Sequence, residues 1–305
     1  MQFLKRTFLF LLTNIAVIAL LSVVMMVINM FFPGLLSMYG GMGQLLVYAF
    51  VIGFGGAFIS LFISRWSAKQ AYNIVLLDAK TALAEPKLEL VWNTVSRIAL
   101  SEGIDMPEVG YYQSDEPNAF ATGASKNKSL VAVSTGLLNQ MEKNEIEGVV
   151  GHEMAHILNG DMVTLTLIQG VMNTFVVFLS HIASRFVVSF FSKGEEDSSA
   201  IGSLSYGIIS IVFQIVFGFL ASFVVMWFSR VREYRADLGG AKYTSKSHMI
   251  AGLKKLKKIS EKVQQTPSVD PKMNAFMINE PDSFFSTHPS LDNRMKALEE
   301  NYQLA

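Results

Sequence analysis

The residues best suited to chemistry are two histidines and a glutamate within five consecutive positions, since residues 152–156 read His-Glu-Met-Ala-His. On a helix, positions i and i+4 lie on the same face, so His152 and His156 can bind one Zn²⁺ ion together. Glu153 can then reach a metal-bound water as a general base. The alternative is a pair of structural histidines on an amphipathic helix. Only five histidines occur in the chain, and two of them stand at ligand spacing, which favours the metal site.

A catalytic zinc site needs a third protein ligand, because the fourth position is left to water. Met162 excludes the extended motif with a third histidine, and the chain has no cysteine. The other histidines are His181, His248 and His288. Glu233 is the better candidate, because it follows an apolar stretch that can return the chain to the level of the first helix. Asp237, one turn later, suits a carboxylate that accepts a hydrogen bond from a ligand histidine. Alternatively, both acids pair with arginines of their own helix.

The metal-binding helix is expected to begin near Asn144, a residue type that caps helix N-termini. Glu145 and Glu147 suit its first turn, where acidic side chains are stabilised by the helix dipole. The helix leads directly into an apolar stretch, so the site is expected near a membrane surface.

The distribution of charge predicts an integral membrane protein. Charged residues make up 16% of the chain and hydrophobic residues 51%, whereas an ordinary soluble domain has about 25% charged residues. Asp, Glu, Lys and Arg are missing from residues 7–64, 162–184 and 198–229. A helix needs about 20 apolar residues to cross a bilayer. We therefore expect four transmembrane helices, at about 8–31, 44–64, 162–184 and 204–228. A purely soluble, fibrous or disordered protein is excluded.

The predicted organisation is a mainly α membrane protein with one water-soluble α+β domain. Residues 1–64 and 162–229 form two transmembrane hairpins, and residues 65–161 and 230–305 form the two parts of the catalytic domain. Basic residues gather on the side of this domain: Lys5, Arg6, Arg65, Lys69, Arg230, Arg232 and Arg235. Only Arg185 and Lys193 fall on the other side. Because basic flanks stay in the cytoplasm, the domain is expected to face the cytoplasm.

Three segments together resemble the M48 family of membrane zinc peptidases over essentially the whole chain. They are His-Glu-Met-Ala-His-Ile-Leu-Asn-Gly-Asp at 152–161, the pair Glu233 and Asp237, and Asn-Ala-Phe-Ala-Thr-Gly at 118–123. The resemblance implies a zincin-like catalytic domain, one Zn²⁺ per chain and Glu233 as the third ligand. It also implies an endopeptidase of the bacterial inner membrane that degrades damaged or misfolded membrane proteins and can cleave itself.

Two further segments are candidates for contacts with a polypeptide substrate. Residues 117–138 predict a hairpin before the metal-binding helix. In similar metallopeptidases an edge strand pairs with the substrate backbone, which makes Asn118, Ala119, Phe120 and Ala121 candidate substrate-binding residues. A structural hairpin over the core is the alternative.

Near the C-terminus, His288 and Arg294 match the family pattern. His288 could donate a hydrogen bond to the oxyanion of the tetrahedral intermediate, or it could be a structural histidine. Arg294 could anchor a C-terminal helix at about 290–300 by pairing with a carboxylate.

Other classes of function fit the sequence less well. The formal net charge is zero, so nothing suggests a nucleic-acid partner. A transporter would carry ionisable residues within its spans, and His181 is the only strongly ionisable residue there. A zinc-dependent scaffold would keep the metal ligands but would have no need of Glu153. A membrane zinc metalloendopeptidase is therefore the function that the sequence predicts.

Overall fold

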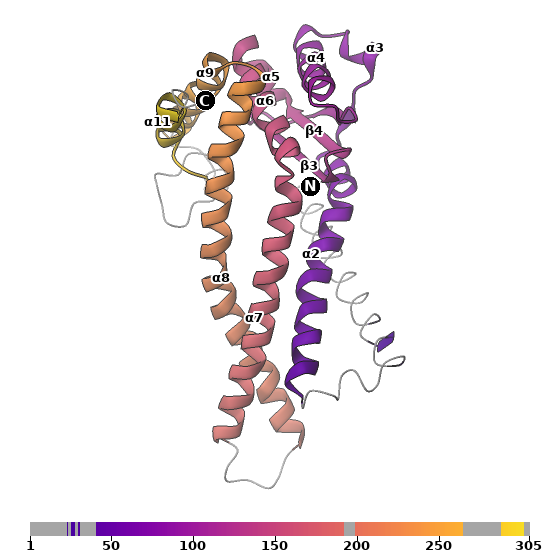
Figure 1. Ribbon diagram of the computed structural model, residues 1–305, viewed down its shortest axis with the longest axis vertical. Helices are drawn as coiled ribbons and strands as arrows, with labels where there is room; N and C mark the ends of the chain where they lie inside the picture. The colour runs from indigo at the N-terminus through magenta and orange to yellow at the C-terminus, as the bar shows by residue number, and fades with distance from the viewer. Residues whose placement is uncertain are drawn as a thin grey trace. The chain divides into compact units, whose positions relative to one another are not determined.

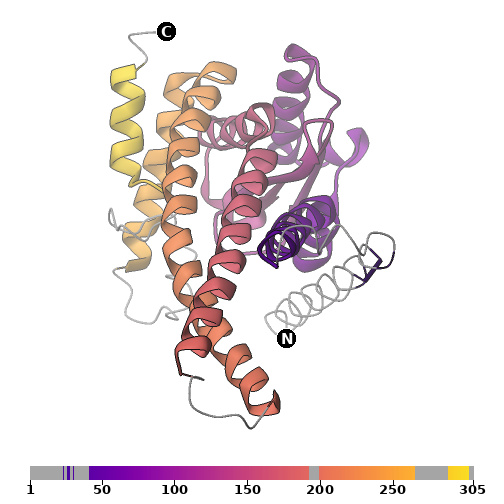
Figure 2. The ribbon, with the colours of Figure 1, turned by 60° about the horizontal axis from the view of Figure 1, so that its bottom comes forward.

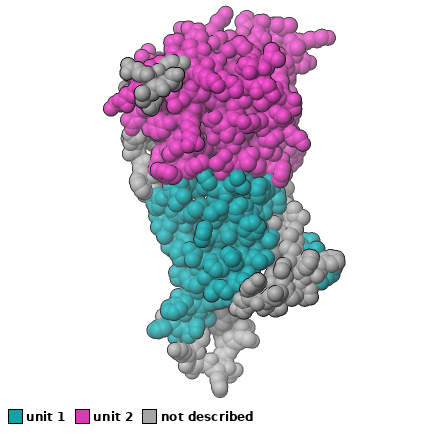
Figure 3. Space-filling view, in the orientation of Figure 1, with its two compact units in different colours: residues 1–60, 165–225 teal, residues 61–164, 226–305 magenta. Residues whose placement is uncertain are grey.

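The computed structural model describes residues 41–191, 199–264 and 288–301, and four single positions before residue 31. Two compact units divide the chain, and each is assembled from two separate stretches (Figure 3). The first takes residues 1–60 and 165–225, and the second takes residues 61–164 and 226–305. Each unit is therefore discontinuous in sequence.

The first unit contains most of three long helices, α2 (Met42–Tyr72), α7 (Asp161–Phe191) and α8 (Ser199–Tyr243). All three are long and apolar enough to cross a membrane. Many of their large apolar side chains are exposed, for example Ile215 at 67% and Phe175 at 54%. Such exposure is costly in water but favourable in the hydrocarbon of a bilayer. Figure 1 and Figure 2 both show α7 and α8 running alongside one another.

Small residues let the membrane helices approach closely within this unit. A Cβ atom on Gly53 of α2 would lie 2.5 Å from the backbone nitrogen of Thr174 in α7. Gly170 of α7 meets the ring of Phe54 in the same way. Close backbone approach of this kind is how helices associate in lipid, where no hydrophobic force acts between them.

Three of the four predicted spans are found as candidate membrane helices. The expected spans at 44–64, 162–184 and 204–228 lie within α2, α7 and α8. The expected span at 8–31 falls outside the described residues, apart from the four single positions. Helices α2 and α8 extend well beyond their predicted spans, to Tyr72 and Tyr243.

The second unit is built on a four-stranded sheet. Its strands are β1 (Val75–Leu76), β2 (Glu108–Tyr112), β3 (Ala119–Ser125) and β4 (Lys128–Ser134), in the order β1-β2-β4-β3. Strands β2 and β4 run parallel, and the other two pairs are antiparallel. The predicted hairpin is therefore confirmed as β3 and β4, and β3 forms one edge of the sheet.

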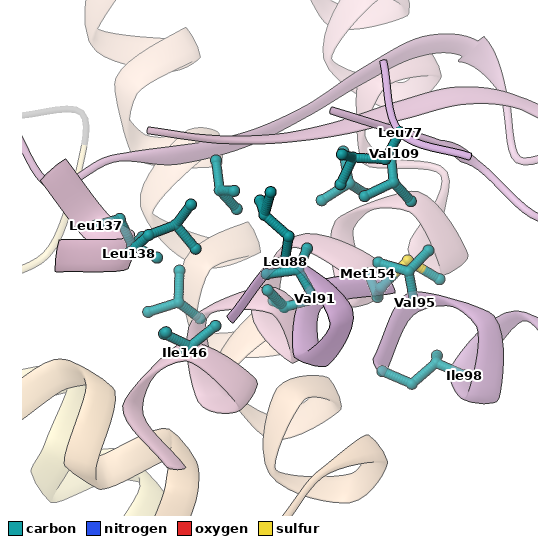
Figure 4. Packing of buried hydrophobic residues seen from close by; sticks show 14 of the residues in the cluster. Leu77, Leu88, Val91, Val95, Ile98, Val109, Leu137, Leu138, Ile146 and Met154 are labelled. Atoms are coloured by element: carbon teal, nitrogen blue, oxygen red, sulfur yellow. The ribbon is translucent and has the colours of Figure 1, made fainter. Parts of the chain in front are cut away.

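Helices α4 (Pro86–Ser101) and α6 (Lys143–Asn159) supply most of the core of this unit. Figure 4 shows Val91, Val95 and Ile98 of α4 close to Ile146 and Met154 of α6. Val109, Val131 and Val133 of the sheet belong to the same cluster. Burial of each such side chain contributes roughly 1.5–3 kcal/mol to stability. Helix α6 is therefore held in place by packing against both α4 and the sheet.

The remaining helices of this unit are α3 (Ala79–Ala82), α5 (Thr135–Gln140), α9 (Lys246–Gln264) and α11 (Leu291–Asn301). A smaller cluster joins Met249 and Leu253 of α9 to Leu291 and Leu298 of α11. Figure 2 shows α11 beside α9 and α8. This packing carries the C-terminal helix back to the end of α8.

Candidate metal centre and active site

Helix α6 begins and ends at well-defined caps. Its N-cap is Glu142, whose backbone N–H donates to Glu145 Oε2 at 2.8 Å, so the two form a capping box. The expected start at Asn144 was wrong by two residues, because Glu142 and Glu145 form a reciprocal pair that binds free N–H groups at the helix start two residues earlier. At the other end Gly160 takes the left-handed conformation, with φ 70° and ψ 30°.

The two predicted histidine ligands point toward one another on α6. Their Nε2 atoms are 3.1 Å apart, and both rings are largely buried. Glu233 of α8 lies opposite, with one carboxylate oxygen 3.5 Å from His152 Nε2 and the other 3.4 Å from His156 Nε2. One ligand atom from each of these three residues lies within 4.8 Å of the others, a grouping that could hold a metal ion.

The far side of each imidazole is occupied by a carboxylate. His152 Nδ1 is 2.9 Å from Asp237 Oδ1, and His156 Nδ1 is 2.6 Å from Asp161 Oδ2. A proton on each Nδ1 leaves the Nε2 lone pairs facing the common point. Neutral imidazoles with carboxylate partners, together with one carboxylate ligand, are a donor set that suits Zn²⁺.

The electrostatics of the cluster favour positive charge at that point. Burial lowers the pKa of His152, but hydrogen bonds with Asp237 and Glu233 more than offset it and raise the pKa to about 10. The pKa of His156 is raised against the effect of burial by Asp161 and Glu233. A cation bound between the Nε2 atoms would supply the same charge while both rings stay neutral. The residues present therefore fit a divalent metal ion.

Glu153 is directed toward the same region but has a different environment. Burial raises the pKa of its carboxyl group, and Glu233 adds to this, while His152 and His156 act in the opposite direction. The backbone N–H of Ala121 on β3 also interacts with the carboxylate and lowers its pKa. The carboxyl group of Glu153 is therefore influenced by the charges of both histidines and of Glu233 and by the backbone of the edge strand.

The free edge of β3 carries the predicted substrate-binding residues. Asn118 and Ser134 form a hydrogen-bonded pair, since Ser134 N–H donates to Asn118 O at 2.8 Å. Hydrogen-bonded and non-bonded pairs alternate in an antiparallel ladder, so the backbone groups of Ala119 and Ala121 point away from β4. The side chain of Phe120, between these two residues, packs its ring against Tyr72 and Tyr112.

The C-terminal residues singled out from sequence also reach this cluster. Arg294 is almost completely buried, and its Nη2 and Nε donate to Asp237 at 2.6 and 2.8 Å. Its Nη1 is 3.3 Å from Glu233 Oε2, which confirms the expected pairing with a carboxylate. His288 is more exposed, and its Nδ1 lies 3.1 Å from Glu233 Oε2.

Two of the three other histidines have partners outside the cluster. His248 Nδ1 is 2.9 Å from Glu147, and His181 Nδ1 is 2.5 Å from the hydroxyl of Tyr206. Asp161 was not predicted to belong to the site, although it lies five residues after His156 in the motif at 152–161. Its separation from His156 does not match a helical face, so only the turn at Gly160 reveals the contact.

Comparison with known proteins agrees with this geometry. The model of "Peptidase family M48" matches residues 87–302. Protease HtpX of Tolumonas auensis is 47% identical over 97% of this chain and 99% of its own length. A protease HtpX homolog of Methylacidiphilum infernorum is 50% identical over 97% of this chain and 98% of its own.

A solved structure supports the fold independently of close sequence similarity. The crystal structure of S. mikatae Ste24p superposes with a TM-score of 0.64 at 17% identity, covering 98% of this chain and 66% of that one. With a matching family model over most of the chain and close relatives along nearly its full length, this chain belongs to peptidase family M48 and is a membrane metalloprotease.

Proposed function

We propose that the chain is a zinc endopeptidase that cleaves damaged or misfolded membrane proteins, with His152, His156 and Glu233 holding one Zn²⁺. The observation that carries the proposal is the convergence of two Nε2 atoms and one carboxylate on a single point. When bound, Zn²⁺ lowers the pKa of a coordinated water to about 7 and polarises a carbonyl group.

Glu153 is the general base in this proposal. Its carboxylate lies beside the ligand histidines, and burial raises its pKa, which makes it a better proton acceptor than an ordinary glutamate. Glu153 takes the proton from the attacking water and passes it to the leaving amine. His288, next to Glu233, donates a hydrogen bond to the oxyanion. Asp237 holds the Nδ1 proton of His152 and so fixes that ring.

The free edge of β3 binds the substrate backbone. Outward N–H and C=O groups at Ala119 and Ala121 can add an extended peptide as a further strand. Asn118 and Phe120 fix the start of that edge through their contacts with Ser134 and the aromatic rings. A peptide placed there lies beside Glu153, because the Ala121 amide already interacts with its carboxylate.

The proposed location is the bacterial inner membrane, with four spans and a cytoplasmic active site. The support is the excess of basic residues flanking the second unit. The two halves of the catalytic domain, 65–161 and 230–305, then lie on one side of the bilayer. A metal-binding helix that is followed directly by the membrane helix α7 suits membrane-protein substrates, and self-cleavage between copies is part of the same proposal.

Cleavage of an unfolded test protein in detergent tests the proposal. Chelator-stripped protein is compared before and after zinc is restored, with Glu153→Gln in parallel. We expect cleavage that depends on zinc and disappears in the variant. Stoichiometric zinc binding without any cleavage would instead favour the scaffold alternative.

A further inference from the structure

Asp161 occupies the junction between the metal-binding helix and a membrane helix. It is the first residue of α7 and directly follows Gly160, the left-handed C-cap of α6. A Cβ atom at Gly160 would meet nothing within 4 Å, so glycine is needed for its positive φ and not for space. At this turn α6 ends, and the side chain of Asp161, the next residue, contacts His156 Nδ1.

We propose that Asp161 is a positioning residue that fixes the ring and the tautomer of His156; the inference rests on the proposed metal site. The contact between Asp161 Oδ2 and His156 Nδ1, at 2.6 Å, is shorter than the corresponding contact of His152 with Asp237, at 2.9 Å. Asp161 is only 6% exposed, so water competes little for its carboxylate. A carboxylate that accepts the Nδ1 proton directs the Nε2 lone pair toward the metal.

The two aspartates differ in the number of groups that bind their carboxylates. Asp237 shares its carboxylate between His152 and Arg294. For Asp161, no lysine or arginine within the described ranges lies at ion-pair distance from the carboxylate. A structural ion pair with a lysine or arginine therefore does not explain why this carboxylate is buried. Its hydrogen bond with His156 Nδ1 does.

The backbone of Asp161 also contacts the segment that carries the third proposed ligand. Arg232 Nη1 donates to the carbonyl oxygen of Asp161 at 3.3 Å. Arg232 directly precedes Glu233 on α8, and Glu233 Oε1 lies 3.4 Å from His156 Nε2. Asp161 thereby holds His156 through its side chain and the segment bearing Glu233 through its carbonyl.

Metal affinity of the full-length protein in detergent tests the inference without relying on activity. Asp161→Ala and Asp161→Asn are titrated with Zn²⁺ against a chromophoric chelator, and the visible absorption of the Co²⁺-loaded protein is recorded. Loss of an outer carboxylate typically weakens metal binding by about 10- to 100-fold, which we expect for Asp161→Ala. We expect a smaller loss for Asp161→Asn, since its amide oxygen still accepts a hydrogen bond from the Nδ1–H of His156. The Co²⁺ spectrum should change in both.

Asp292→Ala is the matched control, because it removes an aspartate whose carboxylate makes a 2.8 Å contact with Lys257 outside the cluster. It should keep the affinity and the spectrum of the parent. If Asp161→Ala kept the zinc affinity and Co²⁺ spectrum of the parent while Glu233→Ala lost zinc affinity, the inference about Asp161 would be overturned and the proposed function would stand. A parent chain that binds no zinc would overturn the proposed function. Should Asp161→Ala fail to fold, the Co²⁺ spectrum of Asp161→Asn decides, and a spectrum identical to that of the parent would overturn the inference.

Discussion

At the level of single residues, the proposed mechanism depends on the buried carboxylate of Glu153, next to the proposed metal ligand His152. Glu153→Gln keeps the shape of the side chain but cannot accept a proton, so the rate should fall while zinc remains bound. General base catalysis typically contributes about 10²- to 10⁴-fold, which is the expected loss in kcat. Peptide cleavage and metal content, measured on the same sample, check this. Activity equal to the parent would exclude Glu153 as the base.

Glu233 is expected to control metal content instead. Glu233→Ala removes the carboxylate that faces both Nε2 atoms and leaves Arg294 with one acidic partner fewer. Loss of a residue that only hydrogen-bonds to a metal ligand typically weakens metal binding by roughly 10- to 100-fold. Glu233→Ala should reduce zinc affinity by more than this, because Glu233 is itself a proposed ligand. Chelator competition measures this, with the exposed Glu261→Ala as control. Undiminished affinity in Glu233→Ala would place the third ligand elsewhere.

Arg294 is expected to matter for stability before it matters for chemistry. Arg294→Met leaves the buried carboxylates of Asp237 and Glu233 without their cation. Removal of one partner of a buried ion pair typically costs about 3–5 kcal/mol. The Tm of the zinc-free variant should therefore fall well below that of the zinc-free parent. Saturating zinc should narrow the gap, since its charge partly replaces the guanidinium; an unchanged zinc-free Tm would contradict this account.

Sequence reasoning found residues of this cluster where their spacing is regular. His152 and His156 stand at helical spacing, so local spacing alone predicted their shared face, with Glu153 next to the first of them. Asp161 was missed because its contact depends on the positive φ of Gly160, which spacing does not reveal. The partners of Arg294 could not be identified either, because they lie 57 and more residues away and meet it only through the packing of α9 against α11.

At the level of secondary structure, apolar length was sufficient for three of the four predicted membrane helices, and a polar turn followed by an apolar run was sufficient for the β3–β4 hairpin. They were not sufficient for strands β1 and β2. Strand β1 has only two residues, and β2 joins β4 in parallel across an intervening hairpin strand. Such non-local pairing depends on tertiary packing and leaves no regular trace in one sequence.

Helix α6 is expected to tolerate no side chain at Gly148. A Cβ atom there would lie 2.3 Å from the carbonyl oxygen of His248 and 2.7 Å from its carbon, both backbone atoms of α9. Alanine favours a helix over glycine by about 0.5–1 kcal/mol, but forced displacement of packed backbone costs about 1–3 kcal/mol. Gly148→Ala should therefore lower Tm. Gly207→Ala on α8, which would meet nothing within 4 Å, should not; equal effects would argue against close packing.

At the level of the whole molecule, basic residues at the ends of the membrane helices also have partners in the second unit. Lys69 and Arg65 of α2 lie 2.7 and 3.6 Å from Glu108 at the start of β2. Arg232 of α8 reaches the start of α7. The residues that would orient the chain by the positive-inside rule therefore include three whose contacts hold these helix ends within the second unit.

The orientation itself can be tested cleanly, because the chain has no cysteine. Single cysteines are introduced as Asn127→Cys in the turn between β3 and β4, and as Ser189→Cys near the end of α7. Both positions are exposed. Intact spheroplasts are treated with a membrane-impermeant maleimide before and after permeabilisation. With the catalytic unit in the cytoplasm, Ser189→Cys should react at once and Asn127→Cys only after permeabilisation. The reverse pattern would place the active site outside, and equal labelling at both positions before permeabilisation would mean that α7 does not cross the bilayer.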